Sequence, residues 1–240
     1  MLHIQRTNDP YRLIDGVKFA SFTGGGGKTT LTEQLARSCT EHRKTVAIAT
    51  TAKIFAVEPF VTFADWKKKG RGAAFVRIGK TVEHGKLTGL TPDEVKSLGD
   101  AYDVVLVEAD GARQCPLKYP ADYEPVIMPC TEKVFIVAGM DGLFKPFEEA
   151  VFRSRLFRER TGLTPRLVYP DIFLRLFSDD ALLKGTAGMD RTVVLNKYDT
   201  YSHRHMAAVL MAKIMEQTGI GEGVIAAAKY GIYYRLTANG

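Results

Sequence analysis

Apolar runs of strand length alternate with amphipathic segments along most of this chain. The runs expected to form buried strands are residues 17–22, 45–50, 103–108, 131–138 and 192–195. Between the first two runs, Leu31, Leu35 and Cys39 recur at the spacing of one helical face. Residues 104–107 are all valine or leucine, as in a central strand that is covered on both faces. This order predicts an α/β fold with a mainly parallel sheet and helices on both faces.

The same pattern suggests one domain. Residues 1–16 are polar and precede the first strand, so we expect them to form a short preamble to a domain that spans 17–240. An amphipathic helix is predicted over 147–160, and a further helical segment begins at Pro170. A small helical subdomain is therefore expected at 146–188.

Turn and capping residues add local detail. Strands at 73–78 and 86–90 are expected to form a hairpin that turns around Gly85. Thr91 has the position of a helix cap, because proline and two acidic residues follow it. The last predicted strand covers residues 223–228.

A glycine run ends the first predicted strand and leads into a lysine and two threonines: Gly24, Gly25, Gly26, Gly27, Lys28, Thr29 and Thr30. Glycines leave room for backbone N–H groups to converge on phosphate oxygens at the start of the following helix. Lys28 would reach the outer phosphates, and the Thr29 hydroxyl would bind the accompanying Mg²⁺. The spacing is that of a compact phosphate-binding loop, G-G-x-G-K-[ST]. It resembles the deviant Walker A class of P-loop NTPases, although Thr23 stands where that class often has a second lysine.

Two carboxylates follow the predicted central strand. Glu108 ends that strand, and Asp110 begins the loop behind it. Because the carboxyl ends of parallel strands meet at one edge of a sheet, both acids are expected beside the phosphates and Mg²⁺. We therefore predict Lys28, Glu108 and Asp110 as catalytic residues, with Thr29 and the two acids holding the metal. Asp141 would reach the same edge, although a glycine-flanked aspartate is also typical of a plain turn.

A second motif follows the strand predicted at 192–195. Asn196, Lys197 and Asp199 match the N-K-x-D element of GTP-binding proteins. The Asp199 carboxylate can accept hydrogen bonds from N1–H and the exocyclic amine of guanine, whereas adenine presents a different pattern. Asn196 would brace the surrounding loops, and the stem of Lys197 would cover the base. The turn at 227–229 weakly resembles the second guanine-contacting loop of GTPases.

Composition limits the class of protein. The chain has 240 residues, of which 45% are hydrophobic and 25% charged, and a net charge of +6. The absence of a long apolar run and the polar N-terminus lead us to expect a cytoplasmic protein that binds neither membrane nor nucleic acid. The spacing of Cys39, Cys115 and Cys130 indicates neither a disulfide framework nor a zinc site.

Several motifs occur in a characteristic order: the glycine loop, TTAKIF, VEADGA followed by Pro116-Leu117-Lys118, VAGMDGLFKP and VLNKYD. In this order the chain resembles the YqeC family. The resemblance implies an accessory role in the maturation of selenium-dependent molybdenum hydroxylases. It also implies a partner protein, either such a hydroxylase or its cofactor machinery.

The expected function is that of an Mg²⁺-dependent GTPase that assists hydroxylase maturation. One alternative is an ATP-dependent small-molecule kinase or ligase, in which Lys53, Arg113, Lys118 and Asp141 bind the acceptor. Another is a nucleotide-gated adaptor that does not hydrolyse and contacts its partner through the basic segment 153–160. The ligands expected in each case are GTP or ATP and Mg²⁺.

Overall fold

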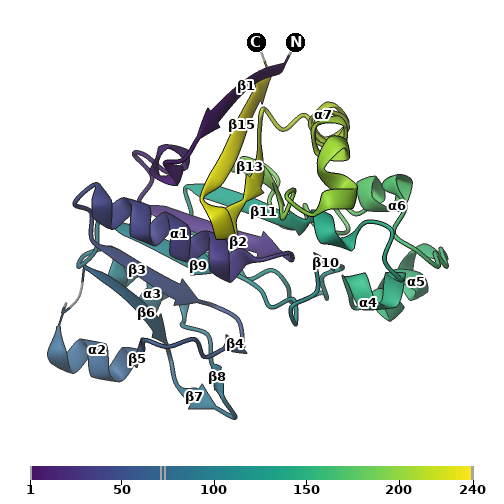
Figure 1. Cartoon of the computed structure of the whole chain (residues 1–240). Coiled ribbons are helices and arrows are strands. Elements are labelled where there is room, and N and C mark those ends of the chain that lie inside the picture. The colour runs from purple at the N-terminus through teal and green to yellow at the C-terminus, as the bar shows by residue number, and fades with distance from the viewer. Residues whose placement is uncertain (1, 71, 73, 239–240) are drawn as a thin grey trace.

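A ten-stranded sheet forms the centre of the computed structural model, which describes residues 2–70, 72 and 74–238 (Figure 1). In spatial order the strands are β1 (Leu2–Thr7), β15 (Ile232–Ala238), β14 (Glu222–Ala227), β13 (Asp190–Asn196), β11 (Lys133–Gly139), β2 (Phe19–Gly24), β9 (Val104–Glu108), β3 (Val46–Thr50), β6 (Phe75–Gly79) and β5 (Phe60–Thr62). All neighbours from β14 to β5 are parallel, whereas β15 is antiparallel to both β14 and β1. The predicted α/β fold with a mostly parallel sheet is confirmed.

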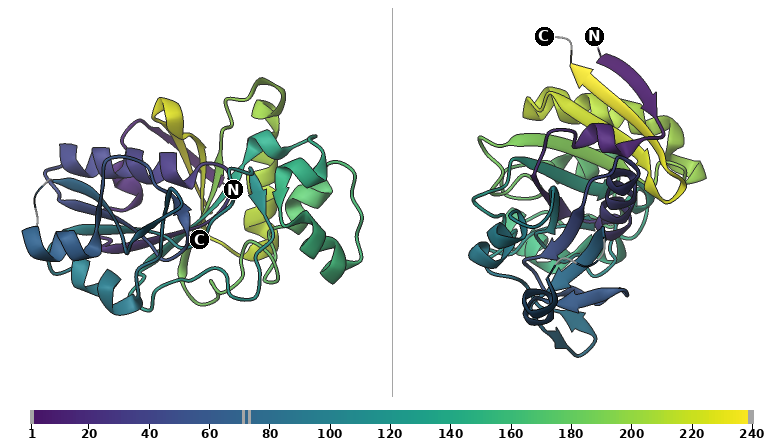
Figure 2. Two further views of the ribbon diagram at one scale, coloured as in Figure 1. Left: turned by 90° about the horizontal axis from the view of Figure 1, so that it is seen from below. Right: turned by 90° about the vertical axis from the view of Figure 1, so that its left-hand side faces the viewer.

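Helices cover both faces of this sheet. They are α1 (Lys28–Glu41), α2 (Phe63–Lys69), α3 (Pro92–Leu98), α4 (Phe147–Ala150), α5 (Ser154–Thr161), α6 (Pro170–Arg175) and α7 (Ala207–Thr218). Short 3-10 helices form η1 (Pro10–Leu13), η2 (Met140–Gly142), η3 (Tyr201–Met206) and η4 (Ala228–Tyr230). Figure 2 shows α1 on one side of the sheet and α2 and α3 on the other.

Side chains alternate between these faces along each central strand. In β9, Val104 and Leu106 pack in the cluster that includes α1, while Val105 and Val107 pack in the cluster that includes α2 and α3. The β11 strand alternates in the same way between the α1 cluster and a third cluster beneath α4 to α7. Burial on both faces explains why these strands are continuous apolar runs.

The N-terminal segment differs from the expected preamble. Strand β1 pairs with β15 along its whole length, from Leu2 opposite Ala238 to Thr7 opposite Tyr233. Residues 2–7 therefore belong to the same sheet as the rest of the domain, and both termini lie at one end of it (Figure 1). The strand at 222–227 is also not the last, because Gly231 turns the chain back into β15 with φ of 65°.

Two local predictions need correction. The turn at Gly85 is present, but it joins two short strands, β7 (Val82–Glu83) and β8 (Lys86–Leu87). Strand β8 also pairs with β4 (Ile54–Phe55). The upstream strand of the expected hairpin, β6, instead joins the main sheet parallel to β3; residue 73 lies outside the described part.

The helix predicted over 147–160 is broken in the middle. Residues Val151–Phe152 form β12, which pairs with β10 (Leu117–Lys118), and Arg153 has φ of 66°. Such a left-handed residue cannot continue a right-handed helix, so α5 starts only after it. Among the described residues, no helix combines the length and apolar character needed to cross a membrane.

Candidate functional site

The glycine loop between β2 and α1 has no room for a larger side chain at any of its four glycines; at Gly25 an added Cβ would lie 2.8 Å from the Cys115 carbonyl oxygen. A Cβ at Gly24 would lie 2.2 Å from the Val137 carbonyl oxygen, and one at Gly26 would lie 2.1 Å from the Gly139 nitrogen. Gly27 has φ of 105°, and a Cβ there would lie 2.8 Å from the Asn196 side chain. Because these neighbours are largely backbone, they cannot move aside cheaply. The loop is thus clamped between the ends of β11, β13 and the segment after β9.

The amides of this loop are not all directed at a ligand. Those of Gly24, Gly25 and Gly26 donate to the Asp110 carboxylate, the Val137 carbonyl and the Cys115 carbonyl, at 3.1, 2.9 and 3.1 Å. The first hydrogen bond of α1 runs from the Leu31 amide to the Gly27 carbonyl, at 3.1 Å. The amides of residues 27–30 precede it and have no acceptor within the helix. These four amides, and not those of the whole glycine run, are arranged to receive an anion.

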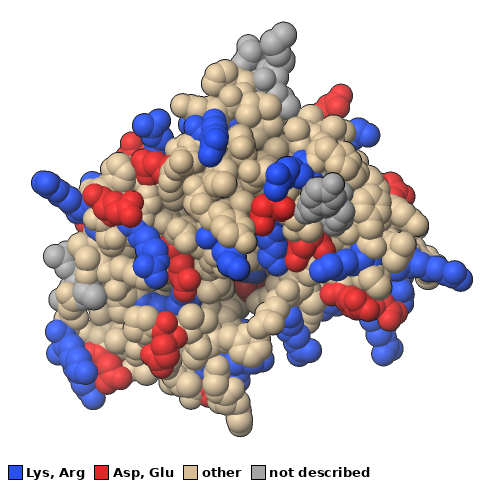
Figure 3. Space-filling view, viewed as in Figure 1, with Lys and Arg blue, Asp and Glu red and all other residues tan. Residues whose placement is uncertain are grey.

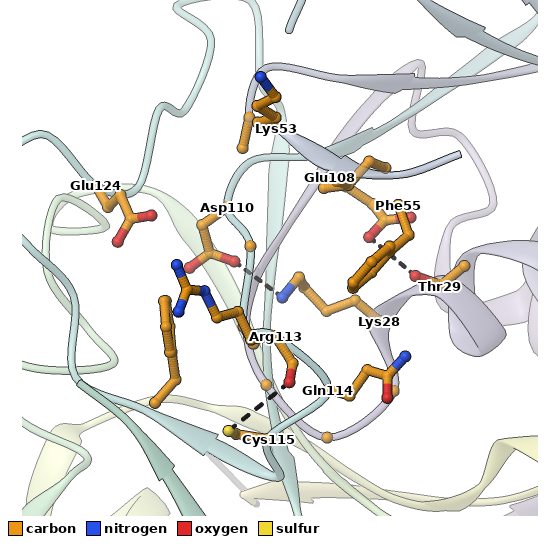
Figure 4. A pocket seen from close by; sticks show the side chains of 18 of the residues that line it. Lys28, Thr29, Lys53, Phe55, Glu108, Asp110, Arg113, Gln114, Cys115 and Glu124 are labelled. Carbon is orange, nitrogen blue, oxygen red and sulfur yellow. Dashed lines mark hydrogen bonds and ion pairs between the residues drawn. The ribbon is translucent and has the colours of Figure 1, made fainter. Parts of the chain in front are cut away.

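Lys28 is held at the floor of the loop. Its ammonium group donates to the Gly24 carbonyl and lies 2.9 Å from Oδ1 of Asp110 (Figure 4). Only 5% of the Lys28 side chain is exposed. The sequence prediction that the lysine and this aspartate share one site agrees with this geometry.

Thr29 and Glu108 meet on the other side of Lys28. The Thr29 hydroxyl donates to Oε2 of Glu108 at 3.1 Å, and Nη1 of Arg77 lies 3.5 Å from Oε1. Burial raises the pKa of Glu108, an effect that the nearby cations Lys28 and Arg77 oppose. A divalent cation in place of the Thr29 hydrogen would stabilise the charged form of Glu108.

The donor set of Thr29 and Glu108 fits Mg²⁺, which prefers oxygen ligands. Within the described residues, no group of three or more His, Cys, Asp and Glu side chains could hold a metal by itself. This is the usual situation for Mg²⁺ in nucleotide sites, where phosphate oxygens and water complete the octahedron. Thr29 and Glu108 would hold the ion, which would neutralise charge on the phosphates.

Asp110 is already occupied by other partners. Its Oδ2 accepts from the Gly24 amide and lies 3.1 Å from Nζ of Lys118, while Oδ1 faces Lys28. Lys118 is fully buried and continues the chain of charges to Glu124, 2.9 Å away. These contacts favour Asp110 as the partner of two lysines over Asp110 as a direct metal ligand.

The N-K-x-D element lies against the same loop. Nδ2 of Asn196 donates to the Gly26 carbonyl at 2.9 Å, and Oδ1 of Asn196 accepts from the Ala228 amide at 3.1 Å. Asn196 therefore braces the glycine loop against the turn at 227–229, as its motif predicts. Lys197 pairs with Asp141 at 2.9 Å and lines the cavity. Asp199 is half-buried, and its carbonyl accepts from Arg204 at 3.3 Å.

A cavity of about 790 Å³ opens in front of the loop. It is lined by residues 25–30, by Glu108 and residues 110–115, and by parts of the segments 51–57, 123–126 and 152–153. Figure 3 shows this face of the molecule hollowed near its centre, with lysine and arginine side chains around the hollow. Lys53 and Arg113 line the cavity, as does Thr51, whereas Lys118 is buried behind it and does not face a ligand there.

Sequence reasoning missed Arg77, Glu124 and Arg153. Arg77 lies on β6 and forms ion pairs with both Glu108 and Glu33. Its Nη2 atom donates to Oε1 of Glu33 at 2.6 Å. Arg153 was expected within the helix predicted over 147–160, in the basic segment 153–160, but it pairs with Glu124 and lines the cavity. A buried arginine in a strand is a weak signal for a site, and the left-handed backbone at Arg153 leaves no periodic trace in the sequence. The remaining arginines of α5 form ion pairs: Arg155 with Glu159, Arg158 with Glu148 and Arg160 with Asp122.

Comparison with known proteins places this site in a family. The family model for the YqeC protein matches residues 20–155. A relative from Escherichia coli (strain K12), described as "Uncharacterized protein YqeC", is 33% identical in an alignment of 184 residues that covers 72% of this chain and 70% of the relative. The chain belongs to the YqeC family. This confirms the resemblance drawn from its motifs.

The residues matched by the family model include most of the candidate site. In this YqeC-family chain the matched range begins in β2 and ends just after Arg153. It therefore contains the glycine loop, both acids at the end of β9 and most of the cavity lining. The N-K-x-D element at 196–199 lies outside the range of the family model.

Proposed function

We propose that this protein binds a nucleoside triphosphate with Mg²⁺, and that the nucleotide is GTP, which it hydrolyses. The observation that carries the proposal is the clamped glycine loop, which presents the free amides of residues 27–30 beside Lys28 and the Thr29–Glu108 pair. Four amides at a helix start, one lysine and one hydroxyl–carboxylate pair together suit a polyphosphate and its metal ion.

Binding would redistribute the contacts of Lys28. The ammonium group would turn from Asp110 toward the outer phosphate oxygens and offset charge on the transferring phosphoryl group. Oδ1 of Asp110 would then be free to accept a hydrogen bond from the attacking water, while Lys118 and the Gly24 amide keep Oδ2 in place. Thr29 and Glu108 would hold Mg²⁺, which supplies electrostatic stabilisation when it is bound.

The contacts of Asn196 support a guanine site. They fix the N-K-x-D loop, the glycine loop and the turn at 227–229 relative to one another, so the base and the phosphates would bind to one rigid frame. A nucleotide without the two guanine donors would leave the Asp199 carboxylate unpaired. This costs about 1–3 kcal/mol, which is roughly 10- to 200-fold in affinity.

Calorimetry with GTP and ATP, each with Mg²⁺, tests the base preference. We expect GTP to bind at least about tenfold more tightly, and Asp199→Asn to abolish that preference while it leaves ATP affinity unchanged. Equal binding of the two nucleotides by the wild type would contradict the guanine assignment. An ATP-dependent kinase or ligase would then be the better proposal.

The family leads us to propose further that nucleotide turnover assists maturation of a selenium- and molybdenum-dependent hydroxylase. The partner would be the hydroxylase or its cofactor machinery, which would recognise a conformation set by the γ-phosphate. Phosphate release measured with and without that partner distinguishes this role from an adaptor role. Tight binding without turnover, even with the partner present, would favour the non-hydrolysing adaptor.

A further inference from the structure

The cavity has a wall that the nucleotide would not use. The triphosphate belongs to residues 27–30, and the base belongs near Asn196 and Asp199. A second set of lining residues comes from other segments: Lys53, Phe55, Lys86, Arg113, Tyr123 and Arg153. We call these residues the far wall. Figure 4 shows Arg113 beside the Lys28–Asp110 pair, with Lys53 farther away at the top of the view.

The far wall is basic, and part of its charge is uncompensated. Lys53 pairs with Glu83 at 2.7 Å, and Arg153 pairs with Glu124. Arg113 and Lys86, in contrast, form no ion pair within the described part of the chain. Their cations lie over aromatic rings instead, Arg113 at 5.3 Å from the Phe152 centroid and Lys86 at 5.1 Å from that of Phe55. Two cations without carboxylate partners at one cavity attract an anion.

Aromatic rings accompany these cations. Phe55 is 51% exposed and Tyr123 71% exposed, so both side chains at the cavity are accessible to a ligand. Phe152 lies beneath both Arg113 and Arg153, whose guanidinium groups are 5.3 and 4.8 Å from its centroid. Exposed rings and guanidinium planes are surfaces on which a flat ring stacks.

The backbone of this region is strained. Arg113, Gln114, Arg153 and Lys197 all line the cavity with positive φ, at 47°, 65°, 66° and 61°. Left-handed backbone is unfavourable for residues other than glycine, and such strain gathers at ligand sites. The loop that carries Arg113 is also tied to the nucleotide site, because the Gly26 amide donates to the Cys115 carbonyl and the Gly139 amide to that of Pro116. A ligand on Arg113 would therefore sit against the loop that binds phosphate.

We propose that the far wall binds a second small molecule, an anion that carries a flat ring, beside the outer phosphate of the nucleotide. The uncompensated charge of Arg113 and Lys86 would hold the anionic group, and the exposed rings would hold the flat part. The position of this subsite beside the outer phosphate rests on the proposed nucleotide function; its chemistry rests on the far wall alone.

Flavin mononucleotide and riboflavin form a matched pair of probes, because they share one flat ring and only the former carries a phosphate. Fluorescence titration of each is carried out on the full chain, first saturated with Mg²⁺ and a non-hydrolysable GTP analogue. We expect flavin mononucleotide to bind at least about tenfold more tightly than riboflavin. Arg113→Ala should remove that difference, whereas Arg155→Ala should leave it intact, since 93% of the Arg155 side chain is exposed on α5 away from the cavity lining.

Several outcomes would overturn the proposal. They are equal binding of the two probes, equal effects of the two arginine variants, and no flavin binding at millimolar concentration. Stronger binding of a tetraglutamate peptide than of flavin mononucleotide would assign the far wall to an acidic protein segment instead.

The nucleotide proposal fails separately. If calorimetry shows no nucleotide binding, the same titration on the nucleotide-free chain, read through Arg113→Ala and Arg155→Ala, still decides whether the far wall recognises an anionic ring. The GTP analogue could also displace flavin mononucleotide from the nucleotide-free chain, one molecule for each analogue bound. That result would mean that the flavin phosphate had occupied the glycine loop, and it would contradict a second subsite.

Discussion

The two walls of the cavity are built in opposite ways. The glycine-loop wall is fixed by backbone contacts within van der Waals distance and by buried charges such as the Lys28–Asp110 pair. The far wall carries exposed aromatic residues and two cations, Arg113 and Lys86, that form no ion pair among the described residues. Rigid placement suits a group that every nucleotide shares, the polyphosphate. Accessible side chains suit a ligand that must enter, be recognised and leave.

The sharpest way to break the fixed wall is at Gly26. This residue has φ of 72°, and an added methyl carbon would lie 2.1 Å from the Gly139 nitrogen, so Gly26→Ala requires movement of β11 or of the loop. We expect it to lower the free energy of unfolding by at least about 4 kcal/mol. The matched control is Gly188→Ala, where φ is 75° and nothing lies within 4 Å, so only about 1–2 kcal/mol of backbone strain is expected. Urea denaturation measures both; equal losses would show that the loop is not clamped.

A pair of lysine variants compares the buried charges behind the glycine loop with the exposed charges of the far wall. Lys118→Met leaves the buried carboxylates of Asp110 and Glu124 without their shared cation, and we expect a loss of about 3 kcal/mol. Lys53→Met removes an ion pair in which both side chains are about half exposed, so no measurable loss is expected. Similar losses in the two variants would contradict the difference in burial between the walls.

The smallest effect concerns the titration of Glu83. The hydrogen bond and charge of Lys53 lower the pKa of this carboxyl below its ordinary value of 4.5. Because the pKa of Glu83 is lowered in the folded state, its pair with Lys53 contributes to the free energy of unfolding at pH values above the ordinary pKa. That contribution is lost as the pH falls through the lowered pKa. Lys53→Met should return the pKa of Glu83 toward 4.5, as followed by carbon-13 NMR of the side-chain carboxyl. An unchanged pKa would mean that the pair does not form in solution.

Much of the fixed wall was predictable because its signals are local. Glycines that precede a lysine and threonine, and acids that end a valine-rich strand, are contiguous patterns with a direct backbone cause. Thr91 is of the same kind: it forms a full capping box with Glu94 at the start of α3. The far wall and the sheet edge depend on long-range pairing. Nothing near Arg153 in the sequence indicates its partner Glu124, and residues 2–7 become a strand only because β15, at the other end of the chain, lies beside them.

Nucleotide binding by the Lys28→Met variant tests the central claim most directly. Methionine keeps the length and the apolar stem of the side chain but removes the charge, and Asp110 retains Lys118 and the Gly24 amide as partners. Arg37→Met, on the exposed face of α1, is the matched control, and thermal unfolding confirms that both variants fold. Calorimetry with Mg²⁺ and GTP should show that Lys28→Met weakens binding by roughly 10- to 100-fold, since a charged hydrogen bond contributes about 1.5–3 kcal/mol, while Arg37→Met binds as the wild type does. Unchanged affinity in a folded Lys28→Met variant would show that the glycine loop does not bind phosphate.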